Sequence, residues 1–359
     1  MNVSVVRPDE LGAADLAAWS AMQRSTPELA HPFLAAGFAQ AVGRVRAGTR
    51  VAVLEEGSTV VGFFTFERGR FGCGRPAAPG VSDRQAVIHV AGLEWNFREL
   101  LRGCQLDVWE FDHLIAGQSA AAGANVTARS SPIIDVSEGY ETYLSERQRT
   151  SKKTLKSTLH KQRKLERDLG AVRFDLDVRD PEPLALLMRW KSAQYRRTGR
   201  RDRFAIRWIE RLVRDLFETR SEECAGTLSV LYAADRVVAA HFGLRSASAL
   251  ACWFPAYDVS LARYSPGLAL HLGMAEAAAR AGVRYLDLGK GGEEYKQSLK
   301  SGDLRVGEGW IERPSATALV RRLQRAPRRA VFGALAHHPR LRREARNALG
   351  RLGSLRRSP

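Results

Sequence analysis

Most of the residue types that could carry chemistry lie in the segment Tyr257–Lys300. An apolar stretch ends there, the chain passes through Ser265-Pro266-Gly267, and the composition then predicts a helix from Pro266 to Ala281. The first backbone N–H groups of a helix have no partner inside it and carry the positive end of its dipole, so they attract anions. We therefore expect an anion such as a pyrophosphate to bind at this helix start. The expected binding residues are Arg263, Ser265, Gly267 and Leu268.

Two other side chains of the second half could transfer protons. Asp287 lies in the apolar run RYLDL, where a carboxylate is costly unless it is paired or hydrogen-bonded. It is either a functional carboxylate or one that bonds to the glycine-rich loop 289–292. His241 follows Val-Val-Ala-Ala on a predicted central strand, where it is either a general base or a core histidine.

The composition is that of a globular protein. The chain has 359 residues with 45% apolar and 26% charged residues, which favours two domains and excludes collagen-like, coiled-coil and disordered classes. Its cysteines stand at positions 73, 104, 224 and 252, without close spacing and without a companion pair of histidines. This pattern indicates neither a zinc site nor a disulfide framework, so we expect no metal.

The positive charge is concentrated in two stretches. The net charge is +17, but residues 315–359 carry twelve arginines against Glu344 alone, and residues 147–167 carry nine lysines and arginines against Glu166 alone. The rest of the chain is close to neutral. The basic helix is either a solvated face or a contact surface for polyanions. Among polyanions, nucleic acid is the least favoured because no recognition motif or aromatic stacking platform accompanies these stretches.

The ends of the chain bear on its location. The N-terminus lacks the basic start and apolar core of a signal peptide, and no apolar run approaches the ~20 residues that a spanning helix needs. We expect a cytoplasmic protein. Residues 315–359 place leucines at helical spacing among arginines, which predicts either a helix that lies on an anionic membrane face or a disordered tail.

Short strands and helices alternate along the chain. The expected strands are 3–7, 50–55, 59–67, 105–111, 132–136, 172–178, 227–233, 237–245, 249–254, 284–288 and 309–312. The expected helices are 11–24, 32–45, 138–169, 183–195, 206–219, 266–281 and 293–300, with a Gly- and Pro-rich loop over 68–84. Val53-Leu54 and Val60-Val61 recur 177 residues later, and the similar element order around them favours a duplicated fold.

The run SPGLAL…AAARAGVRYLDLGKGGEEYKQSLKSG, with WFPAYD and the basic helix before it, resembles the CelD/BcsL-type acetyltransferases, which are related to FemABX-like transferases. The resemblance spans about residues 32–310. It implies an α/β fold with tandem GNAT-like domains that have mixed sheets flanked by helices. The expected divisions are 1–137, 138–314 with a basic entry helix at 147–169, and a tail at 315–359.

The resemblance also implies catalytic roles on the short helix after the RYLDL strand. Tyr295 stands where many GNAT enzymes keep a tyrosine that protonates the leaving thiolate, and Lys296 could stabilise the oxyanion. Adjacent helical residues diverge by about 100°, so we expect only one of them to face the cleft. The usual pyrophosphate signature, Gln or Arg followed by Gly-x-Gly or Gly-x-Ala, is missing from this sequence.

Weaker matches in SDRQAVI and WKSAQYRRTG, together with the basic helix, mark the expected substrate side. The expected substrate-binding residues are Asp83, Gln85, Lys152, Lys153 and Arg197. The resemblance implies transfer of an acetyl or similar acyl group from acyl-CoA to a hydroxyl or amine of a polysaccharide or cell-envelope precursor, as in cellulose or exopolysaccharide biosynthesis. The alternatives are aminoacyl transfer from charged tRNA and a non-catalytic GNAT-like scaffold for a polysaccharide synthase.

Overall fold

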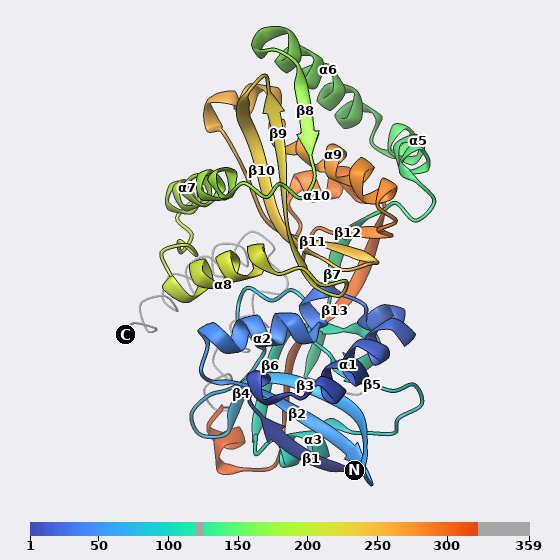
Figure 1. Ribbon diagram of the computed structural model, residues 1–359, viewed down its shortest axis with the longest axis vertical. Coiled ribbons are helices and arrows are strands. Elements are labelled where there is room, and N and C mark those ends of the chain that lie inside the picture. Colours follow the sequence, from blue (N-terminus) through green and yellow to red (C-terminus); the bar gives the residue numbers. More distant parts are fainter. Residues whose placement is uncertain (120–124, 322–359) are drawn as a thin grey trace, which may run out of the picture.

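The computed structural model describes residues 1–119 and 125–321, which form one mixed sheet with helices on both faces. Figure 1 shows this sheet running through two stacked lobes, with the N-terminus in the lower one. The sheet order is β1-β2-β3-β4-β6-β13-β7-β12-β11-β10-β9-β8, and β5 pairs with β3. The strands are β1 (Asn2–Val6), β2 (Thr49–Glu56), β3 (Thr59–Arg68), β4 (Cys73–Arg75), β5 (Val87–His89), β6 (Val108–Ile115), β7 (Val126–Asp135), β8 (Val172–Asp175), β9 (Ala225–Ala233), β10 (Arg236–Arg245), β11 (Ala249–Tyr257), β12 (Tyr285–Asp287) and β13 (Gly302–Glu312).

The same order of elements occurs twice along the described chain. The run β1-α1-α2-β2-β3-β4-α3-β6-β7 is followed by β8-α7-α8-β9-β10-β11-α9-β12-β13. The two hairpins that share an apolar pattern are β2–β3 and β9–β10, which hold the same place in both runs. The α-helices are α1 (Ala13–Ser25), α2 (Ala36–Val45), α3 (Phe97–Gly103), α4 (Ala116–Ser119), α5 (Tyr140–Thr150), α6 (Lys152–Leu169), α7 (Pro181–Arg197), α8 (Arg207–Glu218), α9 (Pro266–Arg280) and α10 (Glu294–Leu299). Short 3₁₀ turns are η1 (Pro8–Glu10), η2 (Pro27–Leu29), η3 (Pro32–Leu34) and η4 (Val259–Tyr264).

The last strand of each run crosses to the other lobe. β13 pairs with β7 and, from Val306 onward, also with β6 of the first lobe. β7 in turn pairs with β12 of the second lobe, with Asp135 opposite Tyr285. The sheet is therefore continuous across the boundary expected at residue 137.

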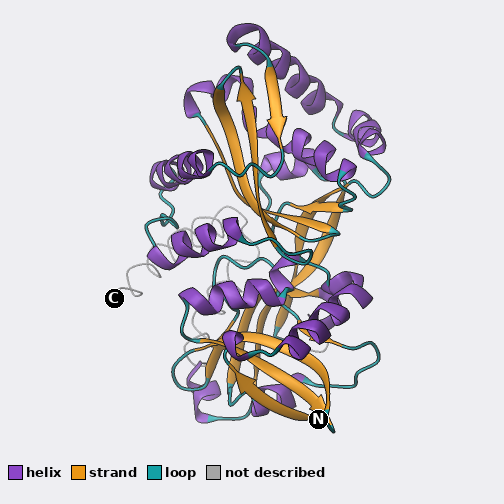
Figure 2. Cartoon of the chain, in the orientation of Figure 1, coloured by secondary structure: helices purple, strands orange, loops and turns teal. Residues whose placement is uncertain are grey.

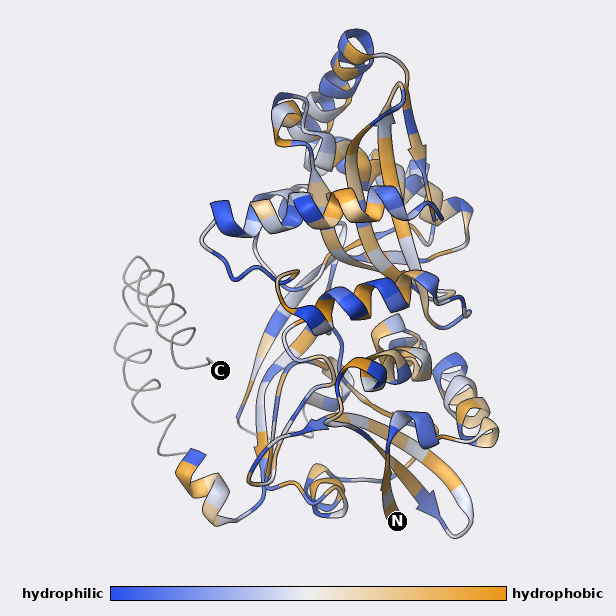
Figure 3. Cartoon of the chain, turned by 60° about the vertical axis from the view of Figure 1, so that its left-hand side comes forward, coloured by the Kyte–Doolittle hydropathy of each residue, from blue (hydrophilic) through white to orange (hydrophobic). Residues whose placement is uncertain are grey.

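Helices cover the second lobe on opposite faces of the sheet. α7 and α8 pack with α2 on one face, and the apolar stripe Ile209, Leu212, Leu216 gives α8 the helical spacing that buries it there. α6 and α9 pack on the other face. Figure 2 shows helices in front of and behind the strands, and Figure 3 shows hydrophobic colour concentrated in the strands and in stripes on the helices.

The basic helix expected over 138–169 is two helices, α5 and α6. They separate at Ser151, whose φ of −137° and ψ of 34° leave the helical range. α5 buries Tyr143, whose hydroxyl donates to the Leu299 carbonyl oxygen at 2.8 Å, whereas α6 buries Leu155 and Leu165 beside η4 and α9. The two segments pack against different partners, so one straight helix would not bury both.

Two features of the sequence bear on membranes. None of the helices described within 1–119 and 125–321 has the length and apolar character needed to cross a bilayer. The basic tail expected to lie on a membrane face falls mainly on residues 322–359, outside the described residues.

Candidate active site

β11 and β12 form a parallel pair that opens after three residues. Their pairing begins at Ala249 and Tyr285 and ends at Ala251 and Asp287, while β11 continues to Tyr257 without β12 beside it. A bulge at Trp253 bends β11 at this point, where the register against β10 shifts. A bulge next to a site re-aims a strand. The second lobe therefore carries a gap in the sheet between the far part of β11 and the end of β12.

The His241 side chain is hydrogen-bonded to the backbone of the bulge beside this gap. Its Nε2 accepts a hydrogen bond from the Trp253 backbone N–H at 3.0 Å, and its side chain is fully buried. Burial, together with the nearby His271, lowers the pKa of His241 well below its ordinary value, so the ring is neutral. This position favours the core-histidine interpretation over the general base.

The start of α9 lies at the end of β11, as the sequence predicts. Ser265 has a left-handed backbone with φ of 53°, and no side chain caps α9. The Lys161 Nζ of α6 donates to the Ser265 Oγ at 3.0 Å, which brings the basic helix to this helix start. A Cβ at Gly267 would lie 3.5 Å from the Tyr257 ring, so this position has ordinary room for a methyl group.

The other expected anion-binding residues differ in exposure. Leu268 is partly buried in the first turn of α9. Arg263 is exposed and donates to the Tyr264 hydroxyl at 2.7 Å, which in turn donates to Asp168 at 2.6 Å. Arg263 is thus already hydrogen-bonded, whereas Lys161 is the cation at the helix start.

Asp287 is a buried junction between the two lobes. Its Oδ1 accepts hydrogen bonds from Ser131 Oγ at 2.7 Å and from Gly289 N at 2.9 Å, so the bond to the glycine-rich loop is present. Its Oδ2 lies 3.5 Å from His31 Nε2 and 3.8 Å from Arg84 Nη1, both from the first lobe. Burial alone would raise the pKa of Asp287, but the His31 imidazole and the Arg84 guanidinium lower it below its ordinary value. Asp287 is therefore ionised and held in place.

Asp83 reaches the second lobe from the loop after β4. A Cβ at Gly289 would lie 3.4 Å from Asp83 Oδ2, and the positive φ of 76° at Gly289 turns this loop toward the carboxylate. Asp83 Oδ1 lies 3.7 Å from His113 Nε2, and His113 Nδ1 lies 3.0 Å from Asp112 Oδ1. Loss of solvation raises the pKa of Asp83, although 29% of its side chain remains accessible. This combination suits a carboxylate that exchanges protons.

Gln85 holds that loop to the first lobe and does not face the gap. Its Oε1 accepts from the backbone N–H groups of Asp112 and His113, and its Nε2 donates to Asp112 Oδ1 at 2.8 Å. Its role in the structure is to fix the position of Asp83, two residues earlier.

Tyr295 and Lys296 diverge on α10, as adjacent helical residues do. The Tyr295 ring lies 5.5 Å from the His271 ring of α9, and burial raises the pKa of its hydroxyl. The Lys296 Nζ turns to the other side, where it donates to the Gly289 and Lys290 carbonyl oxygens at 3.0 and 3.2 Å and lies 3.3 Å from Glu293. Lys296 thus holds the glycine-rich loop beside Asp83, while Tyr295 faces α9.

The three remaining expected residues lie at the surface. Lys152 and Lys153 are exposed in the first turn of α6, about 13 Å of helix away from Lys161. Arg197 is exposed at the end of α7. The structure does not bring these three side chains to the gap.

Sequence reasoning did not single out Lys191, His31, Arg84 or His113. The Lys191 Nζ donates to the Pro255 carbonyl oxygen at 2.9 Å, on the part of β11 that β12 leaves unpaired. A lysine on an amphipathic helix is usually solvated, so only its place in the WKSAQYRRTG match could have marked it. His31, Arg84 and His113 join the site through contacts distant in sequence.

The corresponding place in the first lobe is closed. After β4, residues 76–86 leave the sheet, and the sheet edge is then filled by Gln85, whose backbone N–H donates to the His113 carbonyl at 2.9 Å. The Gln118 side chain bonds both the N–H and the carbonyl of Val87, at 2.8 and 2.7 Å. These bonds occupy the edge that is open in the second lobe.

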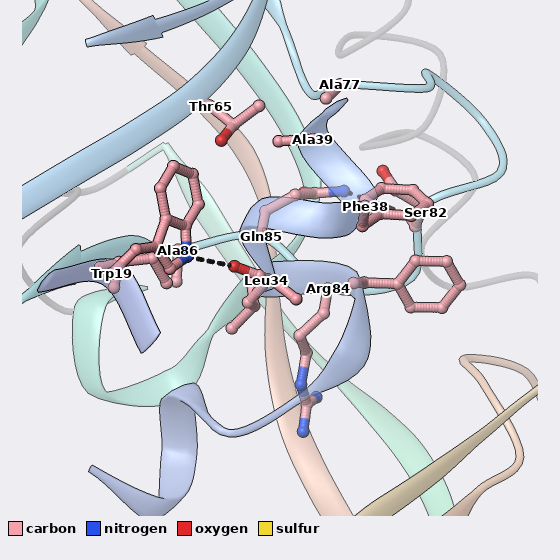
Figure 4. Close-up of a pocket in the computed structure, with 13 residues that line it drawn as sticks. Trp19, Leu34, Phe38, Ala39, Thr65, Ala77, Ser82, Arg84, Gln85 and Ala86 are labelled. Carbon is pink, nitrogen blue, oxygen red and sulfur yellow. Dashed lines mark hydrogen bonds between the residues drawn. The ribbon is translucent and has the colours of Figure 1, made fainter. Parts of the chain in front are cut away.

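A small pocket of about 30 Å³ lies in the first lobe, between η3, α2 and the 77–86 loop, and is lined mainly by apolar residues such as Trp19, Phe33 and Phe38. Figure 4 shows Arg84 at its edge with the guanidinium directed away from the other labelled side chains, consistent with its approach to Asp287. The pocket is therefore separate from the gap in the second lobe.

Neither metal binding nor disulfide formation is indicated in the described part of the chain. No group of three or more His, Cys, Asp or Glu is placed to hold a metal ion there. The four cysteines are free and buried.

Comparison with known families agrees with the position of the gap. Residues 152–297, which include α6 to α9 and the first part of α10, match the family model described as an acetyltransferase (GNAT) domain. This match covers less than half of the chain. The chain has the mixed α/β fold of that family, with the open strand pair β11–β12 inside the matched region. A search of curated proteins found no match.

Solved structures similar to this chain cover most of its length. FemX has 10% identity and a TM-score of 0.56, covering 86% of this chain and 96% of that one. A conserved protein of unknown function from Bacteroides thetaiotaomicron has 10% identity and a TM-score of 0.55, covering 84% and 98%. The structure described as "C-terminal Domain (DUF2156) of Putative Lysylphosphatidylglycerol Synthetase" from Agrobacterium fabrum has 11% identity and a TM-score of 0.51, covering 86% and 94%. At these identities the likeness concerns the fold.

Proposed function

We propose that the protein transfers an acetyl or similar acyl group from acyl-CoA, bound in the gap between β11 and β12, to a hydroxyl or amine. The observation that carries the proposal is the opening of this parallel pair after Ala251, directly before an uncapped helix start. The pyrophosphate would bind at Gly267 and Leu268, where the α9 dipole and the Lys161 ammonium favour an anion. Lys161 supplies the positive charge that the missing signature would otherwise provide.

Three side chains take roles in the transfer. Tyr295 protonates the departing thiolate, because its raised pKa keeps the hydroxyl protonated over the whole neutral range. Asp83 accepts the proton of the acceptor hydroxyl or amine, with His113 and Asp112 behind it. Lys296 holds the 289–292 loop and places positive charge beside the reacting carbonyl. His241 and Asp287 position the strands and the loop on which these groups stand.

The acceptor is a polysaccharide or cell-envelope precursor. Support for this class comes from the resemblance of the SPGLAL…KQSLKSG run to CelD/BcsL-type acetyltransferases. Because α7 and α9 cover opposite faces of β10 and β11, we propose that the acceptor and the nucleotide-bearing donor approach the gap from different sides.

Calorimetry with acetyl-CoA tests the donor site. Gly267→Asp places a carboxylate at the α9 start, where it would repel a pyrophosphate, and should weaken acetyl-CoA binding by about tenfold or more. Gly267→Ala is the matched control, because a Cβ there meets only ordinary contacts, and it should bind acetyl-CoA as the wild type does. Equal affinity in all three proteins would place the donor elsewhere. A complex with charged tRNA but not with acetyl-CoA would favour aminoacyl transfer.

A further inference from the structure

Three basic side chains beside the gap lack a carboxylate partner. Within residues 1–119 and 125–321, Lys191, Arg200 and Arg203 have no acidic group within ion-pair distance, and Lys191 bonds only to the Pro255 carbonyl oxygen. Other arginines of the same lobe are paired, such as Arg196 with Asp202 at 3.6 Å and Arg236 with Asp258 at 2.5 Å. Other cations of this lobe, such as Arg189 and Arg201, also lack a carboxylate partner, but they are exposed, whereas Lys191 and Arg203 are half-buried.

The three groups converge on one place. The Lys191 Nζ lies 5.4 Å from the centre of the Tyr195 ring, one turn along α7. The Arg200 backbone N–H donates to the Tyr195 carbonyl oxygen at 2.9 Å, which brings residue 200 beside Tyr195. Burial raises the pKa of the Tyr195 hydroxyl, and the charges of Arg203 and Arg200 oppose this shift. Burial and the charge of Arg200 both lower the pKa of Lys191. From the first lobe, Gly80 approaches so closely that a Cβ there would lie 2.9 Å from Arg203 Nη1. The cluster thus lies between α7, the 198–205 loop and the first lobe.

Acidic groups stand at the border of this cluster. Glu293 is bonded to Lys296, Asp202 is bonded to Ser192 and lies near Arg196, and Asp83 faces Gly289. Each carboxylate is thus engaged by another group. Lys191 and Arg203 are half-buried, and Arg200 is exposed. Like charges close to one another repel, so an anion that binds between them relieves this repulsion.

The position of the three cations relative to the sheet indicates which of the two substrates carries the anion. α7 covers β10 and β11 on one face, whereas α9, with the expected pyrophosphate site, covers them on the other. Lys191 nevertheless reaches the gap, because Pro255 lies on the unpaired part of β11. A group bound at Lys191, Arg200 and Arg203 is therefore on the opposite side of the gap from the donor phosphates.

We propose that Lys191, Arg200 and Arg203 form an anion-binding subsite for the acceptor, which carries a phosphate or carboxylate group near the hydroxyl or amine that is acylated. This assignment rests on the proposed transferase function and names the class of its second substrate. Phosphate and carboxylate both suit two guanidinium groups and an ammonium.

Calorimetry of the full chain tests the subsite with three sugars: glucose 1-phosphate, glucuronate and glucose. We expect glucose 1-phosphate or glucuronate to bind below about 10 mM and glucose not to bind. The anion that binds more tightly shows whether the acceptor carries a phosphate or a carboxylate group. Arg200→Gln and Arg203→Gln should each weaken the binding of that anion by about fivefold or more. Arg189 is an exposed arginine on α7, and Arg189→Gln should change the affinity for the anion less than twofold.

Acetyl-CoA titrations of the same proteins separate this subsite from the donor site. Arg203→Gln should leave acetyl-CoA affinity unchanged, and Gly267→Asp should leave the anion affinity unchanged. Anion binding without acetyl-CoA binding would overturn the transferase proposal but keep the subsite. If neither anion binds better than glucose, or if Arg189→Gln weakens the anion as much as Arg203→Gln does, the subsite is refuted.

Discussion

At the scale of single residues, the neighbours Tyr295 and Lys296 on α10 have different surroundings and therefore different chemical properties. Tyr295 lies against His271 with a hydroxyl whose pKa is raised by burial, whereas Lys296 bonds to backbone carbonyl groups of the 289–292 loop. One therefore has a proton to give, and the other has its N–H groups already engaged. This difference makes the two side chains separable by mutation.

Tyr295→Phe should lower kcat by about 10²- to 10⁴-fold and leave acetyl-CoA affinity nearly unchanged, because the ring remains while the proton donor is lost. Thiol release from acetyl-CoA measures kcat, and calorimetry measures affinity. Tyr140→Phe, at a half-buried tyrosine of α5, is the control and should keep the wild-type rate. An unimpaired Tyr295→Phe enzyme would remove Tyr295 from the chemistry.

Lys191 makes stability depend on pH. Burial, and then the charges of Arg200 and Lys296, lower its pKa from 10.5 to about 8. Unfolding restores the ordinary pKa, so between these values the unfolded chain binds more protons and the free energy of unfolding rises with pH. The destabilisation by Lys191 is complete below pH 8 and disappears toward pH 10.5.

The expected difference is measured by urea unfolding at pH 7 and pH 10. Relative to Lys191→Met, the wild type should gain stability across this range by up to about 3 kcal/mol. Parallel pH dependence of the two proteins would show that the lysine ionises normally in the folded state.

At the scale of elements, the opening of β11 depends on a close approach between strands. Gly243 of β10 follows the register shift, and a Cβ there would lie 2.2 Å from the Ala251 carbonyl oxygen and 2.6 Å from His241. Neither neighbour can move without displacing the bulge. The geometry of the gap is thus set partly by a residue without a side chain.

Gly243→Ala should therefore destabilise the protein by about 2 kcal/mol or more, because it forces backbone displacement in a packed sheet. Thermal and urea unfolding measure the effect. Gly292→Ala is the control, since nothing lies within 4 Å of a Cβ there and its φ is not positive. Equal stability of the two variants would mean that β10 and β11 adjust freely at the bulge.

The sequence predicted the elements better than their partners. The apolar hairpins over 50–67 and 227–245 and the helix from Pro266 are confirmed, because alternation and the proline at the helix start are local signals. β7 extends back to Val126 through polar residues that are exposed on the described sheet, so no alternation marked it. β7 pairs with β13, which is about 170 residues away, so local sequence cannot predict this pairing.

The site shows the same limit. The helix start at which we expect an anion is a local pattern, and Asp287 is a conspicuous carboxylate in an apolar strand. The approach of Asp83 to Gly289 depends on the path of the 76–86 loop across the lobes, which no spacing in the sequence records. The sequence does not mark Lys191, because a lysine on an amphipathic helix is usually solvated. It becomes unusual only through its contact with Pro255, which is distant in sequence.

At the scale of the whole molecule, the crossing of β7 and β13 joins the lobes into one cooperative unit. β13 lies between β6 and β7, and α2 packs against α8, so neither 1–137 nor 138–314 contains all the strands of its own lobe. A segment cut at residue 137 leaves unpaired strand edges in both pieces.

The chain 1–314 should therefore unfold in one transition, with coincident urea curves from far-ultraviolet circular dichroism and tryptophan fluorescence. Each piece made alone should be unfolded or aggregated. A folded 138–314 fragment with a sharp transition of its own would contradict this expectation.

The excursion of residues 76–86 has a consequence for redesign. This loop starts and ends in the lobe whose own strand edge is closed by Gln85 and Gln118, yet Gly80 and Asp83 stand against the other lobe. Ala77, Ala78 and Val81 are buried in the same core cluster as Phe254 of β11, whereas Pro79 and Gly80 remain accessible. Under the proposed transferase function, we expect variants at Pro79 and Gly80 to change which acceptors are accepted while the acyl donor stays the same. The choice of acceptor would then be adjustable at a turn of the first lobe, apart from the helix start proposed for the donor.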